Sequence, residues 1–364
     1  MPAPGGRRVG AAACGVPRAA CGVPALDLEF APGSTVRGMH AIRQHEFGPP
    51  ANLLYEEVAD PAPAEGQVRI AVEAAGVHLL DTVIRKGQSG GPFPLPDLPM
   101  TPGREAAGRV DVVGPGVDEA WRGRRVVAHL GMASGGYAEL VAAPVGALHE
   151  LPDDLAADVA VAMIGTGRTA MGILEVAEPT AEDVVLVTAA AGGIGSLLVQ
   201  AAHNVGAVVV GAAGGADKVE WARTLGADVG VDYREPAWPK EVRDALDGRD
   251  VTLALDGVGG EIGRGALELL GPGGRIVMFG WSSGEPLQLT TSDLYTGGIT
   301  ASAAVGPRIM QRPGGMRDLE TRALAEAAAG RIVPPLTRFP LADAAQAHAA
   351  LEDRRTLGKT VLVP

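Results

Sequence analysis

Thr188-Ala189-Ala190-Ala191-Gly192-Gly193-Ile194-Gly195 is the stretch that decides the fold. It begins at the last residue of the apolar run 183–188, which has the composition of a strand buried on both faces of a parallel sheet. Residues 196–204 predict a helix, and 207–211 predict a second buried strand. Glycines between strand and helix let the backbone approach a pyrophosphate, which the N–H groups and positive dipole end of the helix attract. We therefore predict a dinucleotide site at residues 191–195.

The alternation of strand and helix continues beyond this stretch. A helix is expected at 218–225, and further strands are expected at 227–232, 251–256 and 274–280. This spacing is typical of a doubly wound parallel sheet, the Rossmann architecture, which we place at residues 166–305.

The segments on either side of this sheet have a different character. Residues 67–74 alternate apolar and polar side chains as a half-buried strand does, and 108–114 and 123–128 are glycine-bounded strands. Residues 88–102 contain five prolines and predict a loop that lines a cleft. We expect 39–165 and 306–364 to form one discontinuous β-rich catalytic domain, to which the final strand at 358–364 returns.

The first 38 residues look foreign to this fold. Ala13-Cys14-Gly15-Val16-Pro17 recurs imperfectly as Ala20-Cys21-Gly22-Val23-Pro24, without strand or helix periodicity and without the apolar core of a signal peptide. We expect a disordered tail, or a natural start at Met39, and a cytoplasmic protein. Cys14 and Cys21 are the only cysteines, so a disulfide or a cysteine-ligated zinc is excluded after this segment.

Composition excludes several classes of partner. The formal net charge of −12 disfavours binding to nucleic acid and to anionic membranes. We expect no membrane span, because no apolar run is seen to approach the roughly 20 residues that a span requires.

The end of the second strand indicates which dinucleotide binds. NAD sites place an acid there to bind the ribose hydroxyls, but residues 211–216 contain none. Lys218 follows closely and can supply positive charge to a 2′-phosphate. The sequence therefore favours NADPH.

At this point a family resemblance is plain. From Met39 onward the chain resembles the zinc-independent quinone oxidoreductases of the medium-chain dehydrogenase/reductase superfamily. The matching stretches include residues 75–82, 101–108, 135–139, 167–170, the glycine loop, 214–218, 231–234, 256–260 and the Gly-Lys ending. The resemblance implies a GroES-like catalytic domain with the Rossmann domain inserted in it, and a homodimer.

The resemblance also implies roles for individual residues around the cofactor. Lys218 and Tyr233 would bind the 2′-phosphate near Gly214, with Arg354 from the C-terminal segment; with Arg355 adjacent, the competing interpretation is an arginine that faces solvent. Along the nicotinamide half it would place Thr169, Val258, Phe279, Gly280 and Ser282. Tyr233 as a turn aromatic and Phe279 as strand-end packing are the competing interpretations.

The zinc site of the superfamily's metal-dependent members lacks its ligands in this chain. Zinc-using relatives carry Cys where this chain has His78 and His where it has Arg104, so too few ligands remain for zinc. Many zinc-free relatives carry Asn in place of His78 and Tyr in place of Val83. His78 could donate a hydrogen bond or a proton to the substrate, or be a buried structural histidine. Asp81 is expected to orient the loop rather than to react.

We therefore expect NADPH-dependent hydride transfer to a quinone or an α,β-unsaturated carbonyl. One alternative is an enoyl-thioester reductase with a basic entrance at Arg85, Lys86, Arg308 and Arg312. Another is a non-catalytic NADPH-binding relative.

Overall fold

The computed structural model describes residues 38–88, 95–131 and 133–364. The tail with Cys14 and Cys21, and residues 89–94 of the proline-rich loop, lie outside the described residues.

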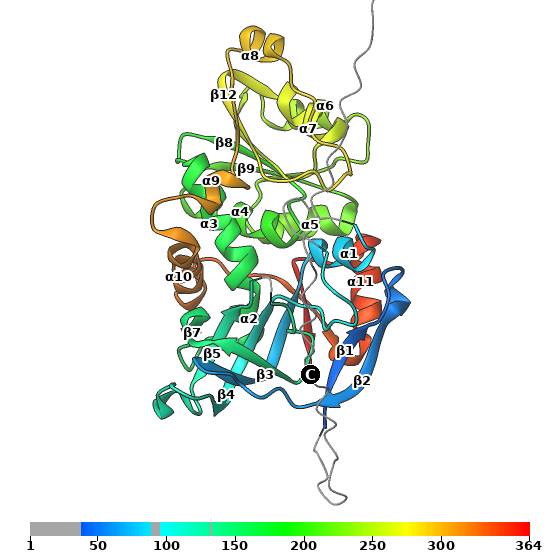
Figure 1. Ribbon diagram of the computed structural model, residues 1–364. Helices are drawn as coiled ribbons and strands as arrows, with labels where there is room; N and C mark the ends of the chain where they lie inside the picture. The colour runs from blue at the N-terminus through cyan, green and yellow to red at the C-terminus, as the bar shows by residue number, and fades with distance from the viewer. Residues whose placement is uncertain (1–37, 89–94, 132) are drawn as a thin grey trace, which may run out of the picture. The chain divides into compact units, whose positions relative to one another are not determined.

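A six-stranded, all-parallel sheet forms one part of the fold (Figure 1). Its strand order is β10-β9-β8-β11-β12-β13. The strands are β8 (Val184–Thr188), β9 (Val208–Ala213), β10 (Val229–Asp232), β11 (Val251–Asp256), β12 (Leu270–Met278) and β13 (Thr300–Ala303). Its connecting helices are α4 (Gly193–Asn204), α5 (Ala216–Thr224), α6 (Trp238–Ala245), α7 (Gly260–Glu268) and α8 (Thr291–Gly297). All five residues of β8 are buried, as the apolar run 183–188 predicts for a central parallel strand.

A seven-stranded sheet forms the other part, with the order β14-β15-β3-β4-β5-β7 and β6 paired to β3. Its strands are β3 (Gln67–Val77), β4 (Glu105–Val113), β5 (Arg125–His129), β6 (Leu140–Pro144), β7 (Leu148–Glu150), β14 (Leu336–Pro340) and β15 (Lys359–Val363). The last strand of the chain, β15, pairs with β3, so segments that precede and follow the parallel sheet in the sequence share this second sheet.

Shorter elements complete the fold. An antiparallel pair forms from β1 (Gly38–Gln44) and β2 (Leu53–Ala59). The helices are α1 (Leu79–Arg85), α9 (Pro307–Met310), α10 (Gly315–Ala328) and α11 (Ala344–Glu352). Single 3-10 turns are η1 (Pro50–Asn52), η2 (Glu119–Trp121), η3 (Val145–Ala147) and η5 (Leu341–Asp343).

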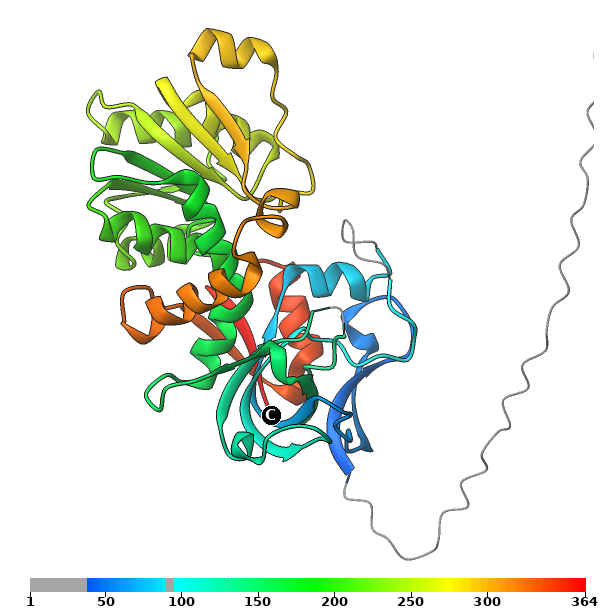
Figure 2. The same cartoon turned by 60° about the vertical axis from the view of Figure 1, so that its left-hand side comes forward.

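A continuous helical run connects the two sheets. It consists of α2 (Ala157–Ala162), the π-helical turn η4 (Met163–Gly167) and α3 (Arg168–Ala177). α2 packs on β3 and β4, whereas α3 packs on α4 (Figure 2). The run is long and apolar enough to pass for a membrane span by length and composition, which the sequence analysis did not expect. Two thirds of it is buried inside the fold, as in the core helix of a globular domain.

Candidate functional site

The glycine loop joins β8 to α4, and α4 begins at Gly193, three residues earlier than predicted. A Cβ atom on Gly195 would overlap the carbonyl oxygen of Ala189, so this glycine lets the helix approach the strand. Gly193 has room, because its nearest neighbour would be Thr166 Cγ2 at 3.4 Å. The first N–H groups of α4 have no partner within the helix. The loop therefore has the geometry of an anion site at a helix N-terminus.

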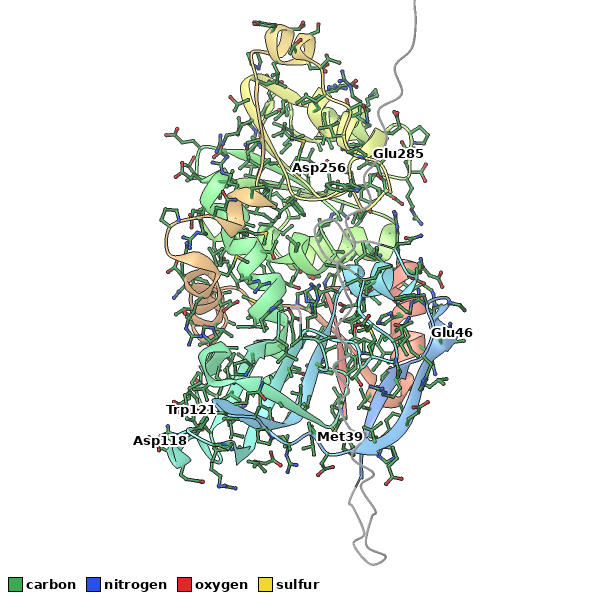
Figure 3. The ribbon with its side chains drawn as sticks, in the orientation of Figure 1. Met39, Glu46, Asp118, Trp121, Asp256 and Glu285 are labelled. Atoms are coloured by element: carbon green, nitrogen blue, oxygen red, sulfur yellow. The ribbon has the colours of Figure 1, made fainter. Side chains whose placement is uncertain are left out.

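The loop lies where the strand order reverses, between β8 and β11. The Thr188 hydroxyl donates to Asp256 Oδ1 over 2.7 Å and accepts from the N–H of Gly257 over 3.0 Å. Asp256, labelled in Figure 3, also accepts from the backbone N–H of Val258 (3.0 Å). These bonds fix both strand ends at the position where open α/β sheets bind their ligands.

The start of β15 also contacts the glycine loop. The N–H of Gly358 donates to the carbonyl of Ala191 over 2.8 Å, and Gly358 bridges Gly192 in parallel. Gly358 has a φ of +61°, and a Cβ atom there would overlap the carbonyl of Pro335. The C-terminal strand is thereby held against the expected pyrophosphate site.

Basic side chains gather at the end of β9, where the 2′-phosphate is expected. The Lys218 ammonium donates to the carbonyl of Arg354 over 2.5 Å, and Arg354 Nη2 donates to the carbonyl of Ser282 over 2.8 Å. Burial, with the nearby charges of Arg354 and Arg234, lowers the pKa of Lys218. A phosphate would relieve this repulsion, since both charged groups that lower the pKa of Lys218 are arginines.

Arg234 was missed in the sequence analysis. It lies near Gly215, and its Nη2 pairs with Asp232 over 2.7 Å. Asp232, at the end of β10, is an acid close to the expected 2′-phosphate site. The sequence analysis looked for an acid only in residues 211–216 and did not consider it. The hydrogen bond from Arg234 lowers the pKa of Asp232 to about 2. The tyrosine predicted here, Tyr233, lies over Gly214, where an added Cβ would be 3.2 Å from its ring.

The residues expected along the nicotinamide half lie on α3 and in the segments that follow β11 and β12. Thr169 is on α3 and donates its hydroxyl to the carbonyl of Gly165 over 2.9 Å. Val258 is buried after β11, and Gly280 follows β12. The Phe279 ring packs against Gly257, which supports the interpretation as strand-end packing. Ser282 lies against Arg354, the residue assigned to the opposite end of the cofactor.

His78 precedes α1 as its N-cap residue. Asp81 Oδ2 accepts from the backbone N–H of His78 over 2.8 Å and from the Tyr137 hydroxyl over 3.1 Å. Arg104 Nε lies 3.4 Å from Asp81 Oδ1. Asp81 thus fixes the backbone at the N-terminus of α1, in agreement with the orienting role suggested from the sequence.

Glu105 and Lys359 lie directly behind His78, and sequence reasoning did not select either. Glu105 Oε1 lies 2.6 Å from His78 Nε2, and Lys359 Nζ lies 2.8 Å from the same nitrogen and 3.1 Å from Glu105 Oε2. Burial alone would raise the pKa of Glu105, but His78 and Lys359 together hold it well below its usual range. The available signals were a lysine in the otherwise uncharged strand β15 and an acid at the start of β4.

These residues do not fit a zinc ion. Among residues 38–88, 95–131 and 133–364, no three His, Cys, Asp or Glu side chains gather as a metal site would require. The ammonium of Lys359 already neutralises Glu105 where a metal would have to bind.

A buried histidine lies behind Asp81 and Tyr137. His348 Nε2 is 3.2 Å from the Tyr137 hydroxyl, and burial lowers the pKa of His348 to about 4. The pKa of a histidine in an unfolded chain is about 6.5, so its contribution to stability is complete above that pH and is lost as pH falls toward 4.

We therefore expect His348→Gln to reduce the acid sensitivity of folding. Between pH 7.5 and 5 the wild type should lose about 2 kcal/mol more free energy of unfolding than the variant. Urea unfolding at the two pH values measures this difference, with His45→Gln, an exposed histidine, as the control. Equal losses in wild type and His348→Gln would contradict the assignment.

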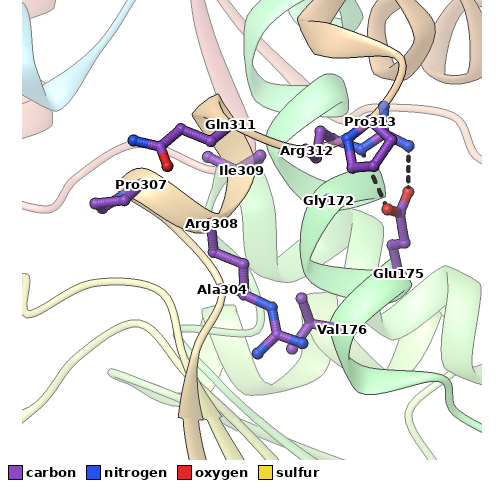
Figure 4. A pocket seen from close by; sticks show the side chains of 10 residues that line it. All are labelled: Gly172, Glu175, Val176, Ala304, Pro307, Arg308, Ile309, Gln311, Arg312 and Pro313. Atoms are coloured by element: carbon purple, nitrogen blue, oxygen red, sulfur yellow. Dashed lines mark hydrogen bonds and ion pairs between the residues drawn. The ribbon is translucent and has the colours of Figure 1, made fainter.

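The structure contains two cavities that bear on the position of a substrate. One of about 250 Å³ is lined by Leu95, Pro96, Met100 and Pro102 of the proline-rich loop, together with Asp81, Arg85 and Arg104. The other, about 400 Å³, lies between α3 and α9 (Figure 4).

The basic entrance suggested for a thioester is largely neutralised. Arg85 is buried, and both it and Lys86 pair with Glu352 at 2.5 and 2.9 Å. Arg308 and Arg312 instead line the α3–α9 cavity, where Arg312 pairs with Glu175 over 2.7 Å. The four residues therefore do not form one basic surface.

Comparison with known families defines the class. The alcohol dehydrogenase GroES-like domain matches residues 64–153, and the zinc-binding dehydrogenase domain matches residues 193–320. This pairing, with the folds described above, is that of a medium-chain dehydrogenase/reductase.

Individual relatives show to which family of this superfamily the chain belongs. The chain is 32% identical to a 2-haloacrylate reductase of a Burkholderia species over 88% of this chain and 97% of that protein. It is 32% identical to quinone oxidoreductase 1 of Escherichia coli over 89% and 99%. The solved Escherichia coli quinone oxidoreductase complexed with NADPH superposes with a TM-score of 0.78 at 30% identity, covering 89% and 100%. The chain belongs to the quinone oxidoreductase family and is an NADPH-dependent oxidoreductase.

Proposed function

We propose that this protein transfers hydride from NADPH to a quinone or an α,β-unsaturated carbonyl compound without using zinc. The observation that carries the proposal is the lysine ammonium 3.1 Å from Glu105, behind the candidate catalytic His78. An isolated carbonyl accepts hydride readily only when a metal ion or a strong proton donor polarises it. Here the carboxylate and imidazole that a metal would need already contact the Lys359 ammonium. A conjugated acceptor delocalises the incoming charge, so orientation and a hydrogen bond from His78 are sufficient.

NADPH supplies the hydride, and the protein supplies orientation and exclusion of water. The glycine loop and the basic cluster of Lys218, Arg234 and Arg354 would hold the two phosphate-bearing parts of the cofactor. Thr169 would lie beside the nicotinamide, whereas Val258 is fully buried and has no surface to offer the cofactor. The 2-haloacrylate reductase among the relatives supports a conjugated acceptor, since a haloacrylate is an activated alkene.

The direct test is spectroscopic measurement of NADPH oxidation with quinones, enones and 2-haloacrylate. Saturated ketones, NADH and a metal chelator serve as controls. We expect NADPH-preferring turnover of conjugated acceptors that survives the chelator. Turnover of saturated ketones that the chelator abolishes would refute the proposal, and binding without any turnover would favour a non-catalytic role.

We also propose that the chain forms a homodimer. Strand β13 is an edge strand, and Tyr295 and Trp281 are 88% and 60% exposed on the neighbouring segments. Edge strands with nearby apolar side chains favour isologous pairing. Light scattering should give twice the 37.0 kDa chain mass, and a monomer would reject this assignment.

A further inference from the structure

We infer that Lys359 and Glu105 are positioning residues, which hold the imidazole of His78 in its reactive orientation and join it to the dinucleotide loop. This inference rests on the proposed function for its catalytic consequence. Its structural content can be tested separately.

The three side chains differ sharply in exposure. His78 is 21% exposed, whereas Lys359 is 4% and Glu105 0% exposed. Among the three, only His78 is therefore accessible to a ligand, and the other two can act only through it.

The fold reserves space for this cluster. A Cβ atom on Gly165 of η4 would overlap Glu105 Oε1 and lie 3.2 Å from His78 Cε1. A Cβ atom on Gly76 of β3 would overlap Glu105 Oε2 and lie 3.1 Å from Lys359 Cε. The carboxylate is thus enclosed between two glycines, which fixes the partners of the imidazole.

The contacts also restrict the protonation of the ring. Nε2 of His78 lies within hydrogen-bonding distance of a carboxylate, which only accepts, and of an ammonium, which only donates. A single ring nitrogen donates or accepts but does not do both, so the balance between the two partners decides which tautomer is present. Asp81, Arg104 and His129 are the other charged or titratable groups that act on this cluster.

Lys359 also connects the cluster to the cofactor site. Its neighbour Gly358 is hydrogen-bonded to Ala191 of the glycine loop, and a Cβ atom on Gly193 would be 3.8 Å from Lys359 Cα. One residue therefore separates the expected pyrophosphate site from the ion pair behind His78. Cofactor binding at the loop would stabilise the same strand that positions the imidazole.

In the reaction, hydride from NADPH adds to the β-carbon of the enone, and the alkene electron pair moves toward the carbonyl oxygen. The resulting enolate takes one proton, and we infer that His78, or a water molecule that His78 orients, donates it. NADP⁺ is the oxidised product. Loss of the fixed orientation should slow this step more than it weakens binding.

The experiment compares Lys359→Met, Lys359→Arg, His78→Gln and the double variant His78→Gln/Lys359→Met. We expect Lys359→Met to lower kcat on an enone by about 10- to 100-fold with the KM for NADPH changed less than about threefold. Lys359→Arg should recover part of the loss. The double variant should be no slower than His78→Gln, because Lys359 acts through His78; effects that multiply would overturn the inference.

The second readout does not need turnover. In nitrogen NMR spectra of histidine-labelled protein, the His78 signal, assigned by its loss in His78→Gln, should change tautomer pattern in Lys359→Met. The exposed variant Lys240→Met should leave it unchanged. An unaltered His78 signal in Lys359→Met would overturn the inference even in an active enzyme, whereas absence of turnover in every variant would reject the proposed function alone.

If Lys359→Met does not fold because it leaves Glu105 charged and buried, Lys359→Met/Glu105→Gln removes both charges together. The same spectral change is expected in that variant, and its absence would again overturn the inference.

Discussion

Replacing Lys218 with alanine and Arg354 with asparagine in one variant should raise the KM for NADPH at least about 100-fold. The KM for NADH should change by less than about threefold. Each lost hydrogen bond between a cation and a phosphate removes about 1.5–3 kcal/mol, and NADH carries no 2′-phosphate to lose them. Asparagine is chosen because Arg354 has a φ of +57°, a conformation that asparagine adopts at lower cost than alanine.

The control for this variant is Lys240→Ala, an exposed lysine on α6 paired with Asp244. It should leave both KM values as in the wild type. Steady-state kinetics with a single acceptor measure all of them. If NADPH and NADH weaken equally in the double variant, the basic cluster does not recognise the 2′-phosphate and supports only the fold of this region.

The sequence was sufficient to predict the parallel sheet and its glycine loop because these depend on local patterns. The apolar run of β8 and the glycines after it are contiguous, so the strand, the turn and the helix could be read together. The family resemblance added Lys218, Tyr233 and Arg354, and the first and last of these do contact each other.

The ion pair behind His78 could not be predicted in this way. Lys359 and His78 are 281 positions apart in the chain, and they meet because β15 returns to pair with β3. Arg234 and Asp232 were missed for a related reason: the end of β10 lies beside the end of β9 only once the parallel sheet has formed. In both cases the strand order, not a local pattern, brings the charges together.

The same loop provides the last prediction, which separates packing from ligand contact. Gly195→Ala should lower the Tm by several degrees and weaken NADPH binding about 100-fold, because the new methyl group overlaps the carbonyl of Ala189 and displaces the N-terminus of α4. Gly193→Ala makes the same change two residues earlier, where the nearest atom would be at 3.4 Å, an ordinary contact. Its Tm should stay within about 2 °C of the wild type, since no atom has to move.

Thermal unfolding without cofactor, followed by NADPH titration of both variants, distinguishes the two effects. If Gly195→Ala keeps its Tm and loses only NADPH, the methyl group blocks the ligand and the overlap with Ala189 is relieved elsewhere. If both variants keep Tm and affinity, the helix N-terminus does not hold the pyrophosphate, and the anion site at residues 191–195 would have to be abandoned. The expected result, instability confined to Gly195→Ala, would show that this glycine is required for helix–strand packing. It would also show that tight NADPH binding depends on that packing.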